Sequence, residues 1–280
     1  MRALEREVQD CLWEVVKELI PPPREHPLGC HRPRVSDRVC FKGLLIRLVS
    51  GMSWVNIESA LDFEVSDTTL RARRDEWIEA GVFDKLVDEA RHGYDRIIGF
   101  ELSDVVIDGS NQKAPCGGEG TGVNPYDRGK LGWKWSVAVD GNGIPLTWIT
   151  DGANRNDYAM LAPTLNNLET NGLTFDIETL HLDRGYGYRA VNELVDNYEI
   201  DDLDVIYRNQ PGQGTTPLVG LGKRWIVEAA NGWLARYGQL RRNTDRKPKH
   251  RHAALCLATT VLITGRLIDH RNKHPNGPIR

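Results

Sequence analysis

The pattern of apolar residues changes once along the chain, near Ile98, and this change limits the folds that the sequence can adopt. Before it, apolar residues recur at the spacing of amphipathic helices, as in the stretch 35–49. After it come short runs rich in β-branched residues, the first of which is 104–108 (DVVID). We therefore expect an all-helical region over residues 1–97 and a mixed α/β domain over residues 98–280.

The helical region contains two short helices joined by a tight connection. The first is expected over 53–61, and the second begins after Ser66, a good N-cap residue, and runs to Ala80. The second helix carries Arg71, Arg73 and Arg74. This arrangement fits a DNA-binding helix-turn-helix, and it also fits an ordinary helical bundle with a charged outer face.

The second region alternates strands and helices. Asp-Gly at 140–141, between two apolar runs, predicts a β-hairpin. Two long helices are expected at the end, after a loop rich in proline and glycine. The order predicts a mixed sheet, with strands at 104–108, 133–139, 144–149, 179–182 and 204–207 and helices at 157–168, 188–198, 224–241 and 252–268.

Three acidic residues stand out by position. Asp108 and Asp183 each end an apolar strand, and each has a glycine within two residues. A carboxylate at the end of a buried strand is costly unless it is paired or binds a cation, although Asp-Gly by itself also simply starts turns. Glu228 lies on the helix 224–241, on the face opposite the one expected to pack on the sheet; taken alone, it could merely pair with Arg224.

Taken together, the three carboxylates point to one chemistry. Ligand sets made only of oxygen suit Mg²⁺, with Mn²⁺ as a substitute. Two such ions about 4 Å apart can activate an attacking oxygen and stabilise a leaving oxygen at phosphorus. The hypothesis is therefore a two-metal-ion site for phosphoryl transfer, held by Asp108, Asp183 and Glu228.

The distribution of charge supports a polyanionic partner. The whole chain has a net charge of −3, but residues 236–280 contain 11 Lys/Arg and only 2 Asp/Glu. Such an asymmetry indicates either a segment that binds nucleic acid or a solvated basic tail.

The motifs around these acids resemble a known family. The stretch 118–146 reads GEGTGVNPYDRGKLGWKWSVAVDGNGIPL, and 152–157 reads GANRND. With Asp-Gly-Ser at 108–110, Asp-Arg-Gly-Tyr at 183–186 and Arg-Trp-Ile-Val-Glu at 224–228, the chain resembles bacterial insertion-sequence transposases of the insertion-sequence-five group. The likeness spans nearly the whole chain. It departs from the wider superfamily at Leu221 and Ala235, where a tyrosine and a basic residue are usual.

The resemblance implies a fold and an activity. It implies an RNase H-like mixed-sheet catalytic domain after a helix-turn-helix region, with Asp108, Asp183 and Glu228 as ligands of two Mg²⁺ ions. It also implies terminal inverted repeats and target DNA as partners, and a homodimer that synapses two ends. Basic residues expected to contact DNA, rather than only to solvate the surface, are Arg71, Arg73, Arg74, Arg128, Lys130, Lys134, Arg184, Arg224, Arg236, Arg241 and Arg242.

Other classes of protein are excluded or kept as alternatives. The five scattered cysteines form no C-x-x-C pair, which argues against a disulfide framework and a zinc knuckle. The glycine loop 117–122 lacks a following Lys-Ser/Thr, so no nucleotide cofactor is expected. No membrane span or secretory signal is recognised, and a cytoplasmic, nucleoid-associated protein is expected. An inactive transposase relic that only binds DNA, and an RNase H-like nuclease without strand transfer, remain as alternatives.

Overall fold

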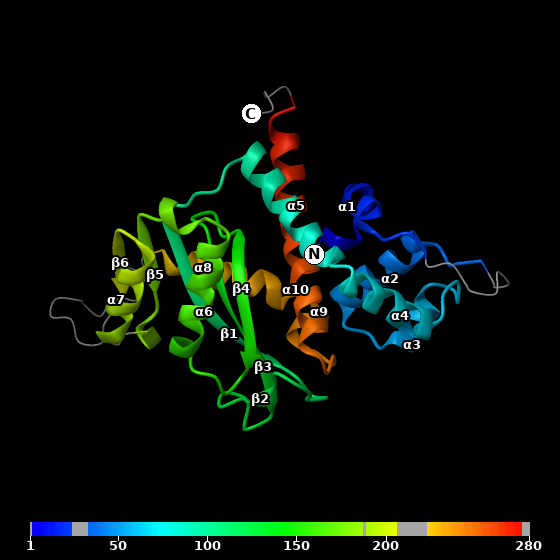
Figure 1. The fold of residues 1–280 in the computed structure, drawn as a ribbon. Coiled ribbons are helices and arrows are strands. Elements are labelled where there is room, and N and C mark those ends of the chain that lie inside the picture. Colours follow the sequence, from blue (N-terminus) through cyan, green and yellow to red (C-terminus); the bar gives the residue numbers. More distant parts are fainter. Residues whose placement is uncertain (1, 24–32, 187–188, 206–222, 276–280) are drawn as a thin grey trace. The chain divides into compact units, whose positions relative to one another are not determined.

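The computed structural model describes residues 2–23, 33–186, 189–205 and 223–275, and the chain packs as two compact units (Figure 1). The helical unit comprises residues 1–98 and 236–280, and the sheet unit comprises residues 99–235. The first boundary lies where the apolar pattern of the sequence changes. Residues 236–275 differ from the expected division, because they pack with the N-terminal helices.

The helical unit is built from helices whose large apolar side chains are mostly buried. Ser66 caps one of them by accepting a hydrogen bond from the backbone N–H of Thr69 at 3.2 Å, as the sequence predicts. The preceding turn contains Asp62 and Phe63, both with positive φ. The helices are α1 (Arg6–Leu19), α2 (Asp37–Ser50), α3 (Trp54–Ala60), α4 (Asp67–Glu79), α5 (Val82–Ile97), α9 (Gly238–Arg241) and α10 (Pro248–Lys273).

The longest helix, α10, explains why the C-terminal segment belongs to this unit. It begins at Pro248, a residue suited to the first turn of a helix, and so starts four residues before the expected position. Its apolar side chains pack against α5 and α1. Among the described residues, α10 alone is long and apolar enough to cross a membrane, but 67% of its most apolar window is buried inside the protein, as in a core helix.

A buried ionic cluster also holds the C-terminal segment. The Asp245 carboxylate lies 3.1 Å from the Arg47 guanidinium and 3.2 Å from that of Arg74. Gln239 donates a hydrogen bond to the same carboxylate at 2.8 Å, and both arginines stack on the ring of Trp54. The cluster connects α2, α3 and α4 to the chain between α9 and α10.

The sheet unit has the strand order β2-β3-β1-β5-β6, with β4 paired to β3. Strands β1, β3 and β4 are antiparallel neighbours, whereas β5 and β6 run parallel to β1. This order confirms the predicted RNase H-like mixed sheet. The strands are β1 (Asp104–Lys113), β2 (Gly122–Val123), β3 (Leu131–Val139), β4 (Pro145–Gly152), β5 (Thr179–Leu182) and β6 (Asp202–Val205), and the helices are α6 (Asp157–Thr170), α7 (Arg189–Val195) and α8 (Arg224–Ala235).

The two faces of the sheet are covered by different helices. Val105, Ile107, Leu180 and Leu182 point into an apolar core shared with α6 and α7. Because side chains alternate along a strand, Val106 and Asp108 point to the other face, which α8 covers. The alternation thus places Asp108 on the side of the sheet that carries α8.

Two expected boundaries and one expected helix cap in the sheet unit are wrong. Strand β1 does not end at Asp108: it pairs with β3 as far as Lys113, because Gly109 and Ser110 fit the extended ladder. Helix α6 is capped by Asn156, so Asp157 is not the cap. Helix α8 ends at Ala235, and the residues after it belong to the helical unit, where the backbone of Gly238 packs directly against Ser50 and leaves no room for a side chain.

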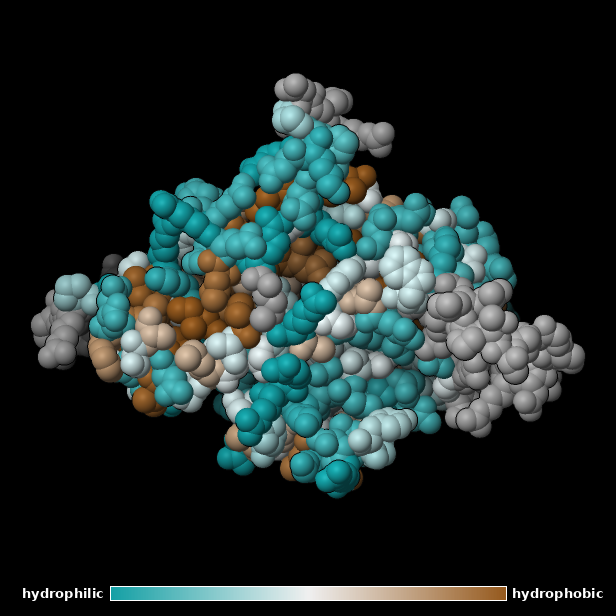
Figure 2. Space-filling view, turned by 180° about the vertical axis from the view of Figure 1, so that it is seen from behind, coloured by the Kyte–Doolittle hydropathy of each residue, from teal (hydrophilic) through white to brown (hydrophobic). Residues whose placement is uncertain are grey.

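The surface is mainly hydrophilic on the face shown in Figure 2, with smaller hydrophobic patches between the polar residues. Large apolar side chains that are exposed occur in both units and do not belong to one element. They are Leu4, Val15, Met52, Val55 and Phe63 in the helical unit and Val123, Tyr126, Leu131, Phe175 and Trp225 in the sheet unit.

Candidate active site

Asp108 and Asp183 lie at neighbouring positions on adjacent parallel strands. Ile107 of β1 is in register with Leu182 of β5, so the next residue on each strand is one of the two acids. Both side chains are half-buried. The carboxylate of Asp183 accepts a hydrogen bond from the backbone N–H of Gly185 at 2.9 Å, which turns the chain directly after the strand. The parallel pairing therefore brings together two acids that are far apart in the sequence.

Helix α8 links the third acid to the same part of the sheet. The helix packs on β1 and β3, and its Asn231 donates a hydrogen bond to the Asp108 carboxylate at 3.1 Å. The same amide accepts a hydrogen bond from the indole N–H of Trp135 at 2.7 Å. Glu228 lies one helical turn before Asn231, with its side chain exposed. Residues three apart on a helix are neighbours on its surface, so Glu228 adjoins the residue that contacts Asp108.

The helical wheel of α8 predicts the wrong environment for one residue. It places Asn231 on the exposed side together with Glu228, but Asn231 is only 8% exposed. The buried face of the helix consists of Ile226, Val227, Ala230, Asn231 and Leu234. The polar amide can be buried because Trp135 and Asp108 satisfy its hydrogen bonds.

A fourth carboxylate and a buried lysine lie beside Gly109, the residue that follows Asp108. The ammonium of Lys134 on β3 is 2.5 Å from the carboxylate of Asp157, at the start of α6. Gly109 makes room for this pair, since a Cβ at this position would overlap the Asp157 carboxylate and the end of the Lys134 side chain. Sequence reasoning missed Asp157 as part of the site because it looked like a helix cap. The glycine that follows Asp108 was the available signal.

The phenol of Tyr186 is affected by the charges of three of these carboxylates. Burial raises the pKa of its phenol well above the ordinary value, and the negative charges of Asp157, Asp108 and Asp183 raise it further. The Tyr186 side chain is almost fully buried, in the turn that follows Asp183. The phenol therefore stays neutral at physiological pH amid three carboxylates.

Divalent cations fit this set of donors. The side chains of Asp108, Asp183 and Glu228 offer only oxygen, the donor that Mg²⁺ and Mn²⁺ prefer. Among the described residues, however, these three carboxylates do not form a cluster with all ligand atoms within 4.8 Å of one another. A site that shares its ligands between two ions about 4 Å apart needs a wider spread than a one-ion site.

Three of the expected DNA contacts are corrected, because their side chains are buried in ion pairs. Arg73 is 5% exposed and contacts Asp37, and Arg74 is 7% exposed and contacts Asp245. Lys134 is paired with Asp157. These cations stabilise the fold and are not displayed to a ligand.

The other expected contacts divide into two sets. Those with exposed side chains are Arg71, Arg128, Lys130, Arg236, Arg241 and Arg242. Arg128 has positive φ within the loop between β2 and β3, and Arg71 pairs with Asp67 one turn earlier on α4. The side chains of Arg184 and Arg224 lie outside the described part of the structure.

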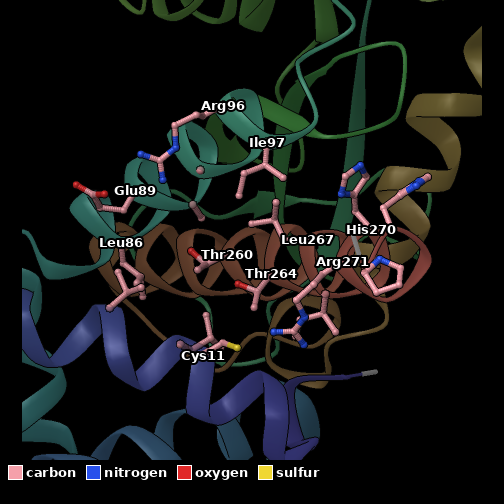
Figure 3. Close-up of a pocket in the computed structure, with 17 residues that line it drawn as sticks. Cys11, Leu86, Glu89, Arg96, Ile97, Thr260, Thr264, Leu267, His270 and Arg271 are labelled. Carbon is pink, nitrogen blue, oxygen red and sulfur yellow. The ribbon is translucent and has the colours of Figure 1, made fainter. Parts of the chain in front are cut away.

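A large pocket lies elsewhere, within the helical unit, and its lining contains none of the three acids. It has a volume of about 620 Å³ and is lined by α1, α5 and α10. Figure 3 shows Thr260, Thr264 and Leu267 of α10 beside Ile97 of α5 and Cys11 of α1, with Arg96 and Arg271 among the polar side chains.

The order and directions of the strands, with Asp108 on β1 beside Asp183 at the end of β5, are those of an RNase H-like domain. Two families match the sequence: "Putative transposase of IS4/5 family (DUF4096)" over residues 8–87, and "Transposase DDE domain" over residues 99–263. The second match covers more than half of the chain. The chain therefore belongs to the transposase DDE domain family, and the predicted kinship with insertion-sequence transposases is confirmed.

Individual relatives agree with this assignment. The "putative transposase for insertion sequence element IS402" of Burkholderia cepacia is 30% identical over 179 residues, which are 62% of this chain and 80% of the relative. The IS402 uncharacterized 16.2 kDa protein of the same organism is 30% identical over 121 residues, or 42% of this chain and 80% of that protein.

Solved structures show only a distant likeness. The Mos1 strand transfer complex is 13% identical, with 88% of this chain and 79% of that chain covered and a TM-score of 0.34. The Mos1 mariner paired-end complex with Mn is 12% identical, with 92% and 86% covered and a TM-score of 0.28. Scores this low carry no argument about the site.

Proposed function

We propose that this transposase cleaves the ends of its own insertion sequence and joins the freed 3′-hydroxyls to target DNA, with Asp108, Asp183 and Glu228 as the catalytic carboxylates. One observation carries the proposal: the register of β1 with β5 sets Asp108 beside Asp183, and α8, which bears Glu228, contacts Asp108 through Asn231. Three segments far apart in the sequence thus meet where β5 ends beside the middle of β1.

Mg²⁺ is the expected cofactor, as two ions, and Mn²⁺ is the expected substitute. When bound, the ions would activate the attacking oxygen and stabilise the leaving oxygen during in-line displacement at phosphorus. Asp108, Asp183 and Glu228 would hold them.

The neighbouring residues position these carboxylates. Asn231 fixes one oxygen of Asp108, and the backbone N–H of Gly185 fixes one oxygen of Asp183. The Lys134 ammonium offsets the charge of Asp157, so that this carboxylate adds little repulsion to the acidic site. Ligands held in this way lose little conformational freedom when cations and DNA bind.

DNA is the proposed partner, in the form of terminal inverted repeats and target sites. The exposed basic residues Arg71, Arg128, Lys130, Arg241 and Arg242 are available for contacts with phosphates. We further propose that α4 acts as the recognition helix of a helix-turn-helix, that the protein works at the nucleoid, and that two copies join to synapse two ends. The helix-turn-helix proposal is supported by the pair α3 and α4 with its short turn.

The test is a strand-transfer assay with purified protein, Mg²⁺ and DNA that carries the inverted repeats flanking the gene. Asp108→Asn, Asp183→Asn and Glu228→Gln should each abolish cutting and joining, because each removes a charged oxygen ligand while the shape of the side chain is kept. DNA affinity, measured by fluorescence anisotropy, should change by less than about threefold. Glu169→Gln is the matched control: this glutamate is also exposed on a helix of the sheet unit, and its variant should retain full activity.

Each alternative function gives a different result in the same assay. A relic that only binds DNA would bind the ends and cut nothing under any metal. A nuclease would cut but give no joined product. Cutting by any of the three substituted proteins at the wild-type rate would refute the assigned roles.

A further inference from the structure

The helical unit contains three metal-ligating side chains that belong to no part of the proposed active site. Asp84 lies in the first turn of α5, and His252 and Cys256 lie one turn apart on α10. Their ligand atoms all fall within 4.8 Å of one another. Among the residues that the structure describes, no other trio of His, Cys, Asp or Glu side chains converges this tightly.

The distances approach those of a tetrahedral metal site. With bonds of about 2.1 Å to nitrogen or oxygen and about 2.3 Å to sulfur, the ligand atoms of a tetrahedral Zn²⁺ lie about 3.3 to 3.7 Å apart. The Cys256 sulfur is 3.5 Å from His252 Nε2 and 3.9 Å from Asp84 Oδ1. Asp84 Oδ1 and His252 Nε2 are 2.6 Å apart, as a hydrogen bond. If a cation replaced the proton of this hydrogen bond, Asp84 Oδ1 and His252 Nε2 would have to move apart by less than about 1 Å. Both side chains are exposed and can make this movement.

The burial of the three groups also suits a metal site. The Cys256 side chain is only 1% exposed, whereas those of Asp84 and His252 are 56% and 44% exposed. A cation could therefore enter past the carboxylate and the imidazole and reach the sulfur behind them. An ion pair between Asp84 and His252 would account for those two residues. It would not account for a buried thiol aimed at both of them.

The protonation states in the absence of metal are consistent with this arrangement. Burial raises the pKa of the Cys256 thiol well above its ordinary value, although the charge of Arg91 opposes this rise. The hydrogen bond from His252 is the main cause of the lowered pKa of Asp84. At neutral pH the free site thus holds a thiol and a carboxylate, and the thiol must lose its proton to a metal.

We propose that Asp84, His252 and Cys256 bind one divalent cation of the Zn²⁺ class, with solvent as the fourth ligand. The mixed oxygen, nitrogen and sulfur donors favour Zn²⁺ over Mg²⁺, because Mg²⁺ prefers ligand sets made only of oxygen. On binding, the sulfur–hydrogen bond breaks, a sulfur–metal bond forms, and the proton passes to the buffer. The cation clamps α5 to α10 and so fixes the basic C-terminal segment on the N-terminal helices. This role is separate from the proposed phosphoryl transfer.

Cobalt gives a direct test, because Co²⁺ bound by a thiolate has a charge-transfer absorption in the near ultraviolet that an oxygen-only site lacks. The full chain, freed of any polyhistidine tag, is titrated with Co²⁺ under reducing conditions and in excess Mg²⁺, which occupies the oxygen-only sites. One equivalent should develop the band, and one equivalent of Zn²⁺ should abolish it.

The variants separate the site from general effects on folding. His252→Ala and Asp84→Asn change exposed side chains and should weaken Co²⁺ binding at least tenfold, while Cys256→Ala should remove the band. Cys40→Ala is the matched control, since Cys40 is equally buried but lies on α2. Circular dichroism of each variant confirms that it is folded. No band in the wild type, or a band that survives in Cys256→Ala, would overturn the proposal.

Release of the proton provides a second readout that does not depend on cobalt. Titration calorimetry with Zn²⁺ in buffers of different ionisation enthalpy should show about one proton released per ion at neutral pH. Affinity should therefore rise with pH up to the pKa of the thiol. Binding of Zn²⁺ without release of a proton would mean that the thiol is not a ligand, and the proposed site would be wrong.

Discussion

At the scale of single residues, Asn231 shows how the fold holds the first acid in place. Its amide N–H donates to Asp108 and its carbonyl oxygen accepts from Trp135, so one side chain connects β1, β3 and α8. A buried amide with both ends satisfied keeps one orientation. Asn231 thereby positions Asp108 without being one of the proposed ligands.

Replacement of Asn231 should therefore affect catalysis more than DNA binding. In Asn231→Ala we expect kcat to fall by about 10- to 100-fold with a small change in KM, because Asp108 loses the bond that orients it. Stability should fall by about 1–3 kcal/mol, since the Trp135 indole N–H loses its partner. The measurements are single-turnover cleavage and urea denaturation.

A second variant separates the two hydrogen bonds. Asn231→Asp keeps an acceptor for Trp135 but removes the donor to Asp108, so activity should be lost while Trp135 keeps its partner. The control is Asn167→Ala: this asparagine of α6 donates to the backbone of Trp148, away from the acids, and its variant should cut DNA at the wild-type rate. Unchanged cleavage by Asn231→Ala would show that Asp108 needs no such support.

The nearness of the two candidate aspartates was easier to predict from the sequence than the residues that surround them. Asp108 and Asp183 could be singled out as candidates because a short strand followed by an acid and a nearby glycine is visible in the local sequence. Asn231 could not, because its partners lie 96 and 123 residues away and the helical wheel ranks an amide as exposed. Cys256 was overlooked for the same reason, since Asp84 is 172 residues distant. Local sequence patterns do not show which distant residues will be in contact.

At the scale of elements, the presence of the helices and strands could be predicted from the sequence, but several of their end residues could not. The cap of α4 at Ser66 and the hairpin between β3 and β4 follow from local turn chemistry. The end of α8 follows from a tertiary contact, because Gly238 must pack against the backbone of Ser50. The sequence predicts that this helix continues to Arg241, because the pattern of the helix alone does not reveal that contact.

The cluster around Asp245 makes the packing of elements in the helical unit sensitive to one carboxylate. Asp245→Asn should lower the free energy of unfolding by about 3–5 kcal/mol, since it leaves Arg47 and Arg74 buried beside a neutral group. Urea denaturation followed by circular dichroism measures this change. Asp269→Asn removes an exposed partner of Arg2 and should change stability by less than about 1 kcal/mol.

The loss of stability caused by Asp245→Asn should depend on pH. Burial tends to raise the pKa of Asp245, but the charges of Arg47 and Arg74 and the hydrogen bond from Gln239 outweigh it and hold the pKa below its usual value. A lowered pKa in the folded state stabilises the protein fully above the unfolded-state pKa of about 4, and this contribution is lost as the pH falls from there through the lower folded-state pKa. The gap between wild type and Asp245→Asn should thus narrow in acid. An equal gap at pH 3 and pH 7 would contradict this account.

At the scale of the whole molecule, charge is divided between the units. The helical unit contains 26 Lys/Arg and 20 Asp/Glu, a net charge of +6, whereas the sheet unit contains 10 and 19, a net charge of −9. An acidic sheet unit repels the phosphate backbone until cations neutralise its carboxylates. The helical unit, and above all its C-terminal segment, should therefore supply most of the electrostatic attraction for DNA.

The salt dependence of binding measures this division. The slope of log K against log salt concentration is negative, and each phosphate contact that is lost should reduce its magnitude by about 0.9. Arg241→Ala and Arg242→Ala, which remove exposed cations after α8, should each produce such a loss and weaken binding to all DNA sequences alike. Lys85→Ala, an exposed lysine at the start of α5, should leave the slope unchanged. Lys130→Ala in the sheet unit could instead reduce the magnitude of the slope while the two arginine variants leave it unchanged. In that case the acidic unit would hold the DNA, and the charge of the C-terminal segment would serve only to keep that segment solvated.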